Sequence, residues 1–195
     1  RNARRKGAKK MCDPIVRLVQ ADLERFQGVR ELHPTLFPDQ DNLYPIPFFG
    51  DIRRAEVLTL ALNPAWTEFS QGGAKERYWL PNNHPPAATA PTLTMRLLHY
   101  FDLPVPGQHQ WFDECEKALL YLGCSYLTNA AHVDLHSLPT KFWRYLNEED
   151  RNFLRHHIHE RSSLDLQKVL EFAPRVKLII VIDYAVPLLG GGHAQ

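Results

Sequence analysis

The sequence lacks a long apolar run, a cysteine framework and a strong overall charge. Its best membrane-span candidate, Leu178 to Leu189, is interrupted by Asp183 and Pro187 and falls well short of the roughly 20 apolar residues that a bilayer requires. The three cysteines form no C-x-x-C pair and leave one unmatched, which argues against a disulfide scaffold and favours a reducing compartment. We therefore expect a cytoplasmic or nuclear protein without a membrane partner.

The net charge of +1 conceals an uneven distribution along the chain. Residues 1–10 carry six basic and no acidic side chains, and the rest of the chain then holds 17 basic against 22 acidic residues. We expect residues 1–10 to be a flexible basic tail, which either attracts phosphate backbones or is a leader without function. With 195 residues and 44% apolar content, residues 11–195 are expected to form one globular domain with its own core.

Apolar periodicity and capping residues predict an alternation of helices and buried strands. The predicted helices span residues 13–28, 91–101, 111–122, a segment that starts at Asn147, and 164–172 with Ser163 as its cap; the predicted strands span residues 57–62, 124–131 and 176–182. The proline-rich residues 29–54 are expected to lie extended over a core. This pattern predicts a three-layer α/β/α domain with a mainly parallel sheet of the four-stranded type, of which three strands are visible.

Two asparagines stand where predicted strands end. Asn63 is followed by Pro64 after the first strand, and Asn129 lies among small apolar residues near the end of the second. Each is open to a structural interpretation, as a turn or a satisfied buried amide. Because ligands of open α/β sheets bind beyond the carboxyl ends of the strands, we expect both amides to share one pocket.

Together these segments make the chain resemble the uracil-DNA glycosylase superfamily. Residues 61–65 (ALNPA) are similar to the Gly-x-Asn-Pro-Gly motif of its mismatch-specific and single-strand-selective branches, with alanine at both glycine positions. Residues 127–132 (LTNAAH) are similar to the strand end that carries the base-reading asparagine. Residues 45–50 (PIPFFG) resemble the segment before the first strand, and residues 176–185 resemble the third strand.

The resemblance implies hydrolysis of the N-glycosidic bond of uracil or a related deaminated base in DNA. Asn63 would hold the attacking water, and Asn129 would read the edge of the flipped base. Phe69 or Tyr78 would stack on the base, and Ala65 would stand where the stringent branch has a thymine-excluding tyrosine. This interpretation depends on the two amides facing one pocket.

One family feature is missing from the sequence. The family normally has a fourth strand followed by His-Pro-Ser, whereas this chain stops soon after its third strand and contains no His-Pro-Ser. The resemblance therefore implies either a C-terminally incomplete member or a degenerate relative with impaired catalysis. The second alternative is a non-catalytic protein of the same fold that binds nucleic acid.

A third alternative is a metal-dependent hydrolase. His132, Asp134 and His136 would share one face of an extended segment, as half of a metal site. A loop triplet without a metal is the favoured interpretation, because no second ligand pair stands out, and we assign no metal and no cofactor. His156, His157 and His159 are expected to lie on a solvated helix.

Overall fold

Three short apolar segments form one parallel sheet in the computed structural model, which describes residues 13–37, 43–64, 89–102, 110–141 and 145–182. The strands are β1 (Val57–Ala61), β2 (Ala130–Asp134) and β3 (Leu178–Val181). Their order is β2-β1-β3, and Val57 is in register with both Ala130 and Leu178. The predicted α/β class and parallel sheet are confirmed, and the described residues contribute three strands.

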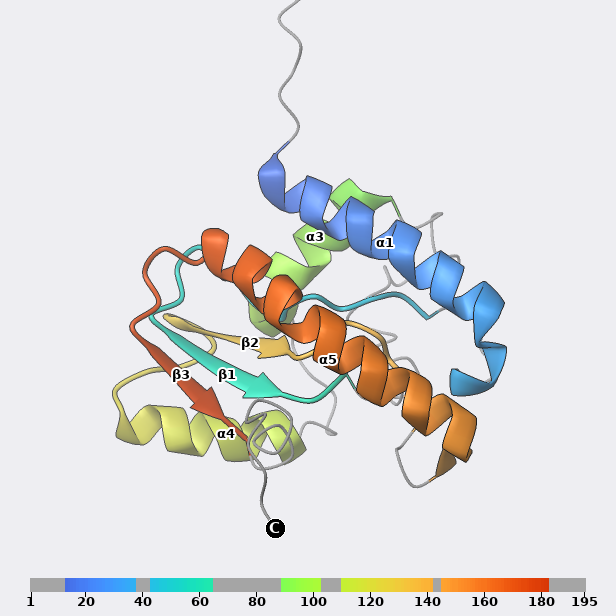
Figure 1. The fold of residues 1–195 in the computed structure, drawn as a ribbon. Coiled ribbons are helices and arrows are strands. Elements are labelled where there is room, and N and C mark those ends of the chain that lie inside the picture. The colour runs from blue at the N-terminus through green and yellow to red at the C-terminus, as the bar shows by residue number, and fades with distance from the viewer. Residues whose placement is uncertain (1–12, 38–42, 65–88, 103–109, 142–144, 183–195) are drawn as a thin grey trace, which may run out of the picture.

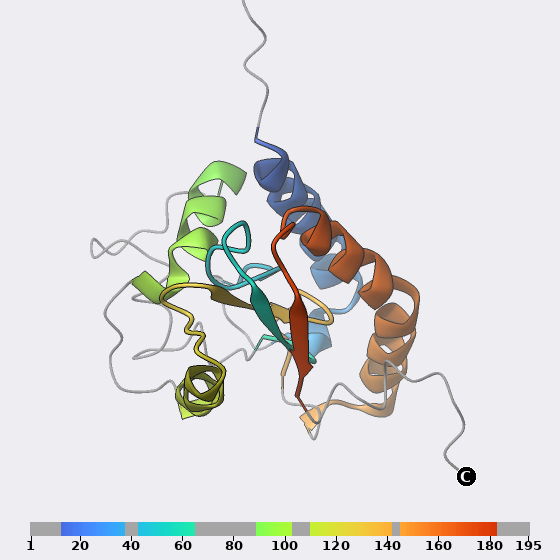
Figure 2. The ribbon, with the colours of Figure 1, turned by 90° about the vertical axis from the view of Figure 1, so that its left-hand side faces the viewer.

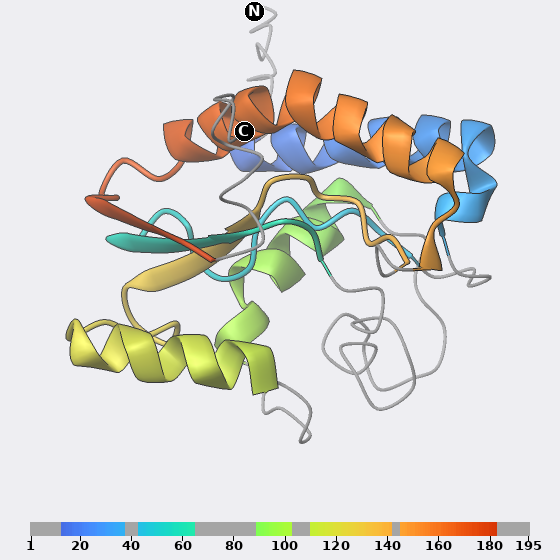
Figure 3. The same cartoon turned by 60° about the horizontal axis from the view of Figure 1, so that its bottom comes forward.

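Helices cover both faces of this sheet (Figure 1). They are α1 (Pro14–Leu32), α3 (Ala90–Leu98), α4 (Gln110–Tyr121) and α5 (Glu148–Glu171), with short 3₁₀ turns at η1 (Pro34–Leu36) and η3 (Tyr100–Asp102). Figures 2 and 3 show α1 and α5 on one side of the strands and α3 and α4 on the other, so the layers are α/β/α. Within the described residues, no helix is long and apolar enough to cross a membrane.

The first helix begins where the sequence predicts and ends later. Asp13 caps it by accepting a hydrogen bond from the backbone amide of Ile15 at 3.0 Å, and Pro14 occupies the first turn, where its missing N–H costs nothing. The helix continues through Gly28 to Leu32. The stop comes from Pro34, because a proline disfavours helical geometry in the residue before it.

The last helix, α5, is continuous, so the predicted second helix with its cap at Ser163 is wrong. Asn147 caps α5 as predicted, accepting a hydrogen bond from the amide of Asp150 at 2.7 Å. No proline or glycine occurs between residues 148 and 171, so nothing in this stretch breaks the backbone hydrogen-bond ladder. A serine within a helical stretch does not by itself mark the start of a new helix.

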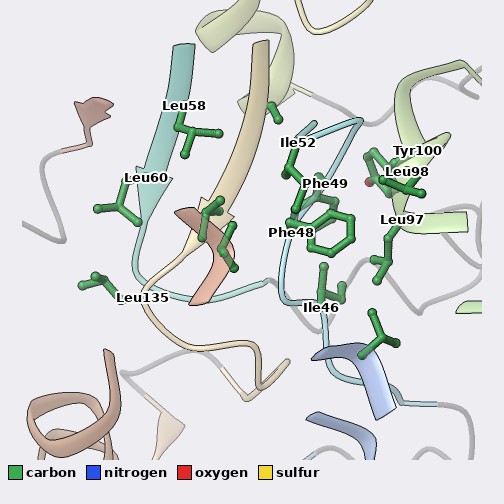
Figure 4. Packing of buried hydrophobic residues seen from close by; sticks show 14 of the residues in the cluster. Ile46, Phe48, Phe49, Ile52, Leu58, Leu60, Leu97, Leu98, Tyr100 and Leu135 are labelled. Carbon is green, nitrogen blue, oxygen red and sulfur yellow. The ribbon is translucent and has the colours of Figure 1, made fainter. Parts of the chain in front are cut away.

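An extended segment, residues 43–50, closes the outer edge of β2; we call it the strap. Phe49 and His132 exchange backbone hydrogen bonds of 2.8 and 2.9 Å in an antiparallel bridge, and the amide of Ile46 donates to the carbonyl of Ser137. Figure 4 shows Phe48 and Phe49 of the strap between the sheet and the side chains of α3 and η3. Residues 43–50 thus lie extended over the core as expected. For the start of the proline-rich region 29–54 the expectation is wrong, because residues 29–32 belong to α1 and Pro34–Leu36 form η1.

Candidate functional site

Asn63 lies at the carboxyl edge of the sheet, the edge at which all three parallel strands end. It follows β1 by two residues, and its side-chain nitrogen Nδ2 donates to the carbonyl of Pro64 at 3.0 Å and to Oγ1 of Thr140 at 3.3 Å. Because a carbonyl can only accept, these contacts fix which end of the amide is nitrogen. Within the described residues, no hydrogen bond involves Oδ1 of Asn63.

Asn129 lies at the opposite edge of the sheet, so the predicted pocket shared by two amides is wrong. It precedes β2, and its backbone carbonyl accepts from the amide of Glu56, the residue before β1. Its Oδ1 accepts from the amide of Ser125 at 3.2 Å and from the hydroxyl of Thr128 at 3.0 Å. Both contacts belong to a turn, and they give Asn129 the structural role that was the alternative interpretation.

The predicted second strand, residues 124–131, is placed too early, and this error misplaced Asn129. Residues 125–129 form a turn that is closed by the side chains of Ser125 and Thr128. The carboxylate of Glu116 on α4 accepts hydrogen bonds from the hydroxyl of Ser125 and the amide of Tyr126. The strand starts only after this turn, so Asp134, rather than Asn129, ends it.

A buried row of polar side chains crosses the face of the sheet that α4 covers. The hydroxyl of Tyr126 lies 2.6 Å from Oγ1 of Thr59, and that oxygen lies 2.8 Å from Nδ1 of His132. On the other side of the ring, Nε2 of His132 lies 3.2 Å from Oδ1 of Asp134. Burial raises the pKa of Tyr126, so its hydroxyl keeps its proton. The row therefore reaches the carboxyl edge at Asp134.

Aromatic rings enclose His132 on its remaining sides. Trp111, in the first turn of α4, packs edge-on against the imidazole with ring centroids 4.7 Å apart, and Phe112 and Phe49 contact it at 5.4 and 5.5 Å. Trp111 keeps 39% of its surface exposed, whereas His132 has 2%. Thr59 and Trp111 were not among the predicted site residues. A polar Thr59 inside an otherwise apolar strand was the available signal.

The three polar residues of the proposed metal site do not come together. His132 and Asp134 are in contact, but His136 lies beyond the end of β2, where its Nδ1 accepts a hydrogen bond from the amide of Leu138 at 3.2 Å. Burial, and then the charges of His157 and Arg25, lower the pKa of His136 to about 3, so the ring is neutral. The described residues contain no group of three or more side chains suited to a metal ion.

The other predicted side chains fall into two groups. Ala65, Phe69 and Tyr78 lie outside the described residues. On α5, His156 is exposed as expected, and the half-buried His157 stacks on Phe153 with ring centroids 5.5 Å apart. The side chain of His159 lies outside the described residues.

A second polar link joins α1 to the chain that follows β2. Arg25 forms an ion pair with Asp22, and it also donates to the hydroxyl of Ser137 at 2.9 Å. These groups lie on the side of the sheet covered by α1 and α5, where they line a small hollow together with Val133, Asp134 and Val169. This link anchors the segment that leads to Thr140, the partner of Asn63.

Comparison of the chain with known protein families, with curated proteins and with solved structures gives no match. The candidate site is therefore defined by its own residues: Asn63 and Thr140 beyond β1 and β2, and the row that ends at Asp134.

Proposed function

We propose that the chain is an N-glycosidase that removes uracil or a related deaminated base from DNA, with Asn63 as the residue that holds the attacking water. The observation that carries the proposal is the orientation of the Asn63 amide. Its nitrogen is held by Pro64 and Thr140, and its oxygen points away from these partners at the carboxyl edge of the sheet. Ligands of open α/β sheets bind at this edge.

The chemistry of the proposal requires a water aimed at the sugar carbon and a base that leaves as an anion. The carbonyl oxygen of Asn63 accepts a hydrogen bond from the water and so directs its lone pair toward the sugar. An amide does not take up the water's proton, however, so Asn63 positions the nucleophile without activating it. A site built on Asn63 alone is therefore expected to be slow.

Base selection in this proposal does not involve Asn129. Its side chain is used within the turn before β2, at the other end of the strand. Of the two amides that the sequence brought forward, only Asn63 is at the carboxyl edge. The shared pocket on which the uracil interpretation depended is lost, and with it the base-reading residue. The proposal therefore rests only on Asn63, the α/β/α layers and the resemblance of residues 61–65.

The test is release of uracil from a single-stranded and a double-stranded oligonucleotide, measured as alkali-labile abasic sites with enzyme in excess. We expect release by the unaltered chain and a loss of at least about tenfold in Asn63→Ala. Asn129→Ala is the matched control, since it removes the same amide at the other edge. Absence of release by the unaltered chain, or equal rates for the unaltered chain and Asn63→Ala, contradicts the proposal.

A second candidate function is nucleic-acid binding without catalysis. It is favoured because Asn129, the amide expected to read the base, lies at the opposite edge of the sheet from Asn63. This function predicts DNA binding that weakens steeply with salt, is equal for uracil- and thymine-containing strands, and is accompanied by no abasic sites. The same oligonucleotides, used in a binding titration at two salt concentrations, distinguish the two functions.

A further inference from the structure

We infer that Asp134 is the general base of this site and that His132, with Thr59 and Tyr126 behind it, positions its carboxylate. The inference rests on the proposed function. It adds a proton acceptor, a role that the amide of Asn63 cannot fill. Its starting point is the environment of Asp134, whose side chain is 2% exposed and whose one ion-pair contact in the described part of the chain is His132. A buried carboxylate with so few polar contacts is costly, and such groups concentrate at functional sites.

The contacts of the row favour one tautomer of the His132 ring. A bare ring nitrogen facing a carboxylate would be repelled by it, so Nε2, which lies 3.2 Å from Asp134, carries a proton. In the neutral ring Nδ1 then accepts from the hydroxyl of Thr59, and Thr59 accepts in turn from Tyr126. The two hydroxyls and Nδ1 are hydrogen-bonded in this arrangement, and Nε2 makes an ion-pair contact with Oδ1 of Asp134, which lies against the imidazole.

The strand register places Asp134 near Asn63. Asp134 is the partner of Ala61, and the pairing continues as Leu135 donates to the carbonyl of Ala61 and His136 to that of Leu62. Asn63 follows two residues after Ala61. With neighbouring strands about 4.8 Å apart and a rise of about 3.3 Å per residue, a chain that continued extended past Ala61 would place the Cα atoms of Asp134 and Asn63 roughly 8 Å apart. The inference requires a water to fit between these two short side chains.

The reaction balances with these two residues. Asn63 holds the water, whose oxygen forms a bond to C1′ of the sugar while the bond from C1′ to the base nitrogen breaks. The electron pair of that bond leaves with the base as an anion, and the proton of the water passes to the carboxylate of Asp134. The base takes a proton from solvent after it leaves, and Asp134 returns its own to solvent. The products are the free base and an abasic sugar.

The first test is Asp134→Asn, which keeps the shape and an oxygen facing His132 but does not accept the proton. We expect the single-turnover rate of uracil release to fall by about 10²- to 10⁴-fold, with little change in the affinity for the oligonucleotide. A rate within threefold of the unaltered chain overturns the inference, and the loss in Asn63→Ala would then leave the proposed function standing.

The second test separates positioning from folding and decides the matter if Asp134→Asn does not fold. Thr59→Val removes the hydroxyl that orients His132 while it preserves the side-chain volume, and Thr59→Ser preserves the hydroxyl. We expect Thr59→Val to lose up to about 10²-fold in rate and Thr59→Ser to recover most of it. Equal rates for the two variants overturn the positioning role. Absence of release by the unaltered chain contradicts the proposed function itself.

Discussion

The carboxylate of Glu116 accepts a hydrogen bond from the backbone amide of Tyr126 at 2.9 Å, and its other oxygen accepts from the hydroxyl of Ser125. This contact ties the C-terminal half of α4 to the turn before β2. It fixes where the chain stops turning and the strand begins. The boundary of β2, and with it the residues at the carboxyl edge, therefore depends on a side chain that lies outside the strand.

We expect Glu116→Ala to lower the free energy of unfolding by about 1–2 kcal/mol, because a charged acceptor of two hydrogen bonds is removed from a half-buried turn. The matched control is Glu114→Ala on the same helix, where the exposed carboxylate pairs with Lys117. Such surface pairs contribute little, so the control should stay within about 0.5 kcal/mol. Urea denaturation measures both, and equal effects would contradict the anchoring role of Glu116.

We expect opposite effects on stability when Gly50 and Gly28 are replaced by alanine. Gly50 has a φ of +89°, and a Cβ there would lie 2.8 Å from a ring carbon of Phe101, so Gly50→Ala should destabilise the fold by about 1–3 kcal/mol. Gly28 lies inside α1 with open space around it, so Gly28→Ala should stabilise the fold by about 0.5–1 kcal/mol. Thermal unfolding of both variants checks the pair, and shifts of equal sign would contradict it.

The lowered pKa of His136 predicts that the folded protein loses stability at acidic pH. Its pKa is about 3 in the folded protein and about 6.5 when unfolded, so the unfolded chain binds the extra proton between these values. The contribution of the neutral ring is complete above pH 6.5 and is lost as the pH falls toward 3, on the order of 5 kcal/mol in all. The measurement is the free energy of unfolding of the unaltered chain at several pH values across this range.

His136→Asn is the variant that isolates this effect. Its side-chain oxygen stands near the position of Nδ1 and accepts from the amide of Leu138, but it does not titrate. We expect lower stability at pH 7, because the smaller side chain leaves a cavity, together with a shallower decline between pH 6.5 and 4. An unchanged slope would show that other groups produce the acid sensitivity.

We expect Thr140 to position the side-chain amide of Asn63 through their hydrogen bond. Thr140→Val removes the oxygen that accepts from Nδ2, so the amide of Asn63 keeps only the carbonyl of Pro64. We expect the rate of uracil release to fall while the affinity for the oligonucleotide stays the same, and Thr140→Ser to restore the rate. If valine and serine give equal rates, the contact does not position Asn63.

The sequence predicts the layers well because they follow from local patterns. Apolar runs of β1 and β3 and the caps at Asp13 and Asn147 are read from neighbouring residues, and the structure confirms these strands and caps. The predicted burial of the third strand is wrong, because Leu178 and Val181 of this edge strand are exposed. The start of β2 is different, since residues 124–129 contain enough apolar side chains to resemble a strand. Their turn is stabilised by Glu116, a contact across ten residues that no local pattern shows.

The site was predicted only in part for the same reason. Asn63 stands at the carboxyl edge because β1 was placed correctly, whereas the shift of β2 moves Asn129 to the amino edge and brings Asp134 to the strand's end. The link between Thr59 and His132 joins residues 73 positions apart, so only the sheet register reveals it. A contact between side chains on different strands can be predicted only after the boundaries of both strands are placed correctly.

The two outer edges of the sheet differ: the strap lies beside β2, and β3 forms the other edge. The bridge between Phe49 and His132 occupies the outward backbone groups of His132 in β2, while within the described residues no strand pairs with the outer side of β3, whose Leu178 and Val181 are exposed. Unpaired strand edges are where another strand can add. Among the described residues this open edge lies beside β3, on the side of the sheet farthest from His132 and Asp134.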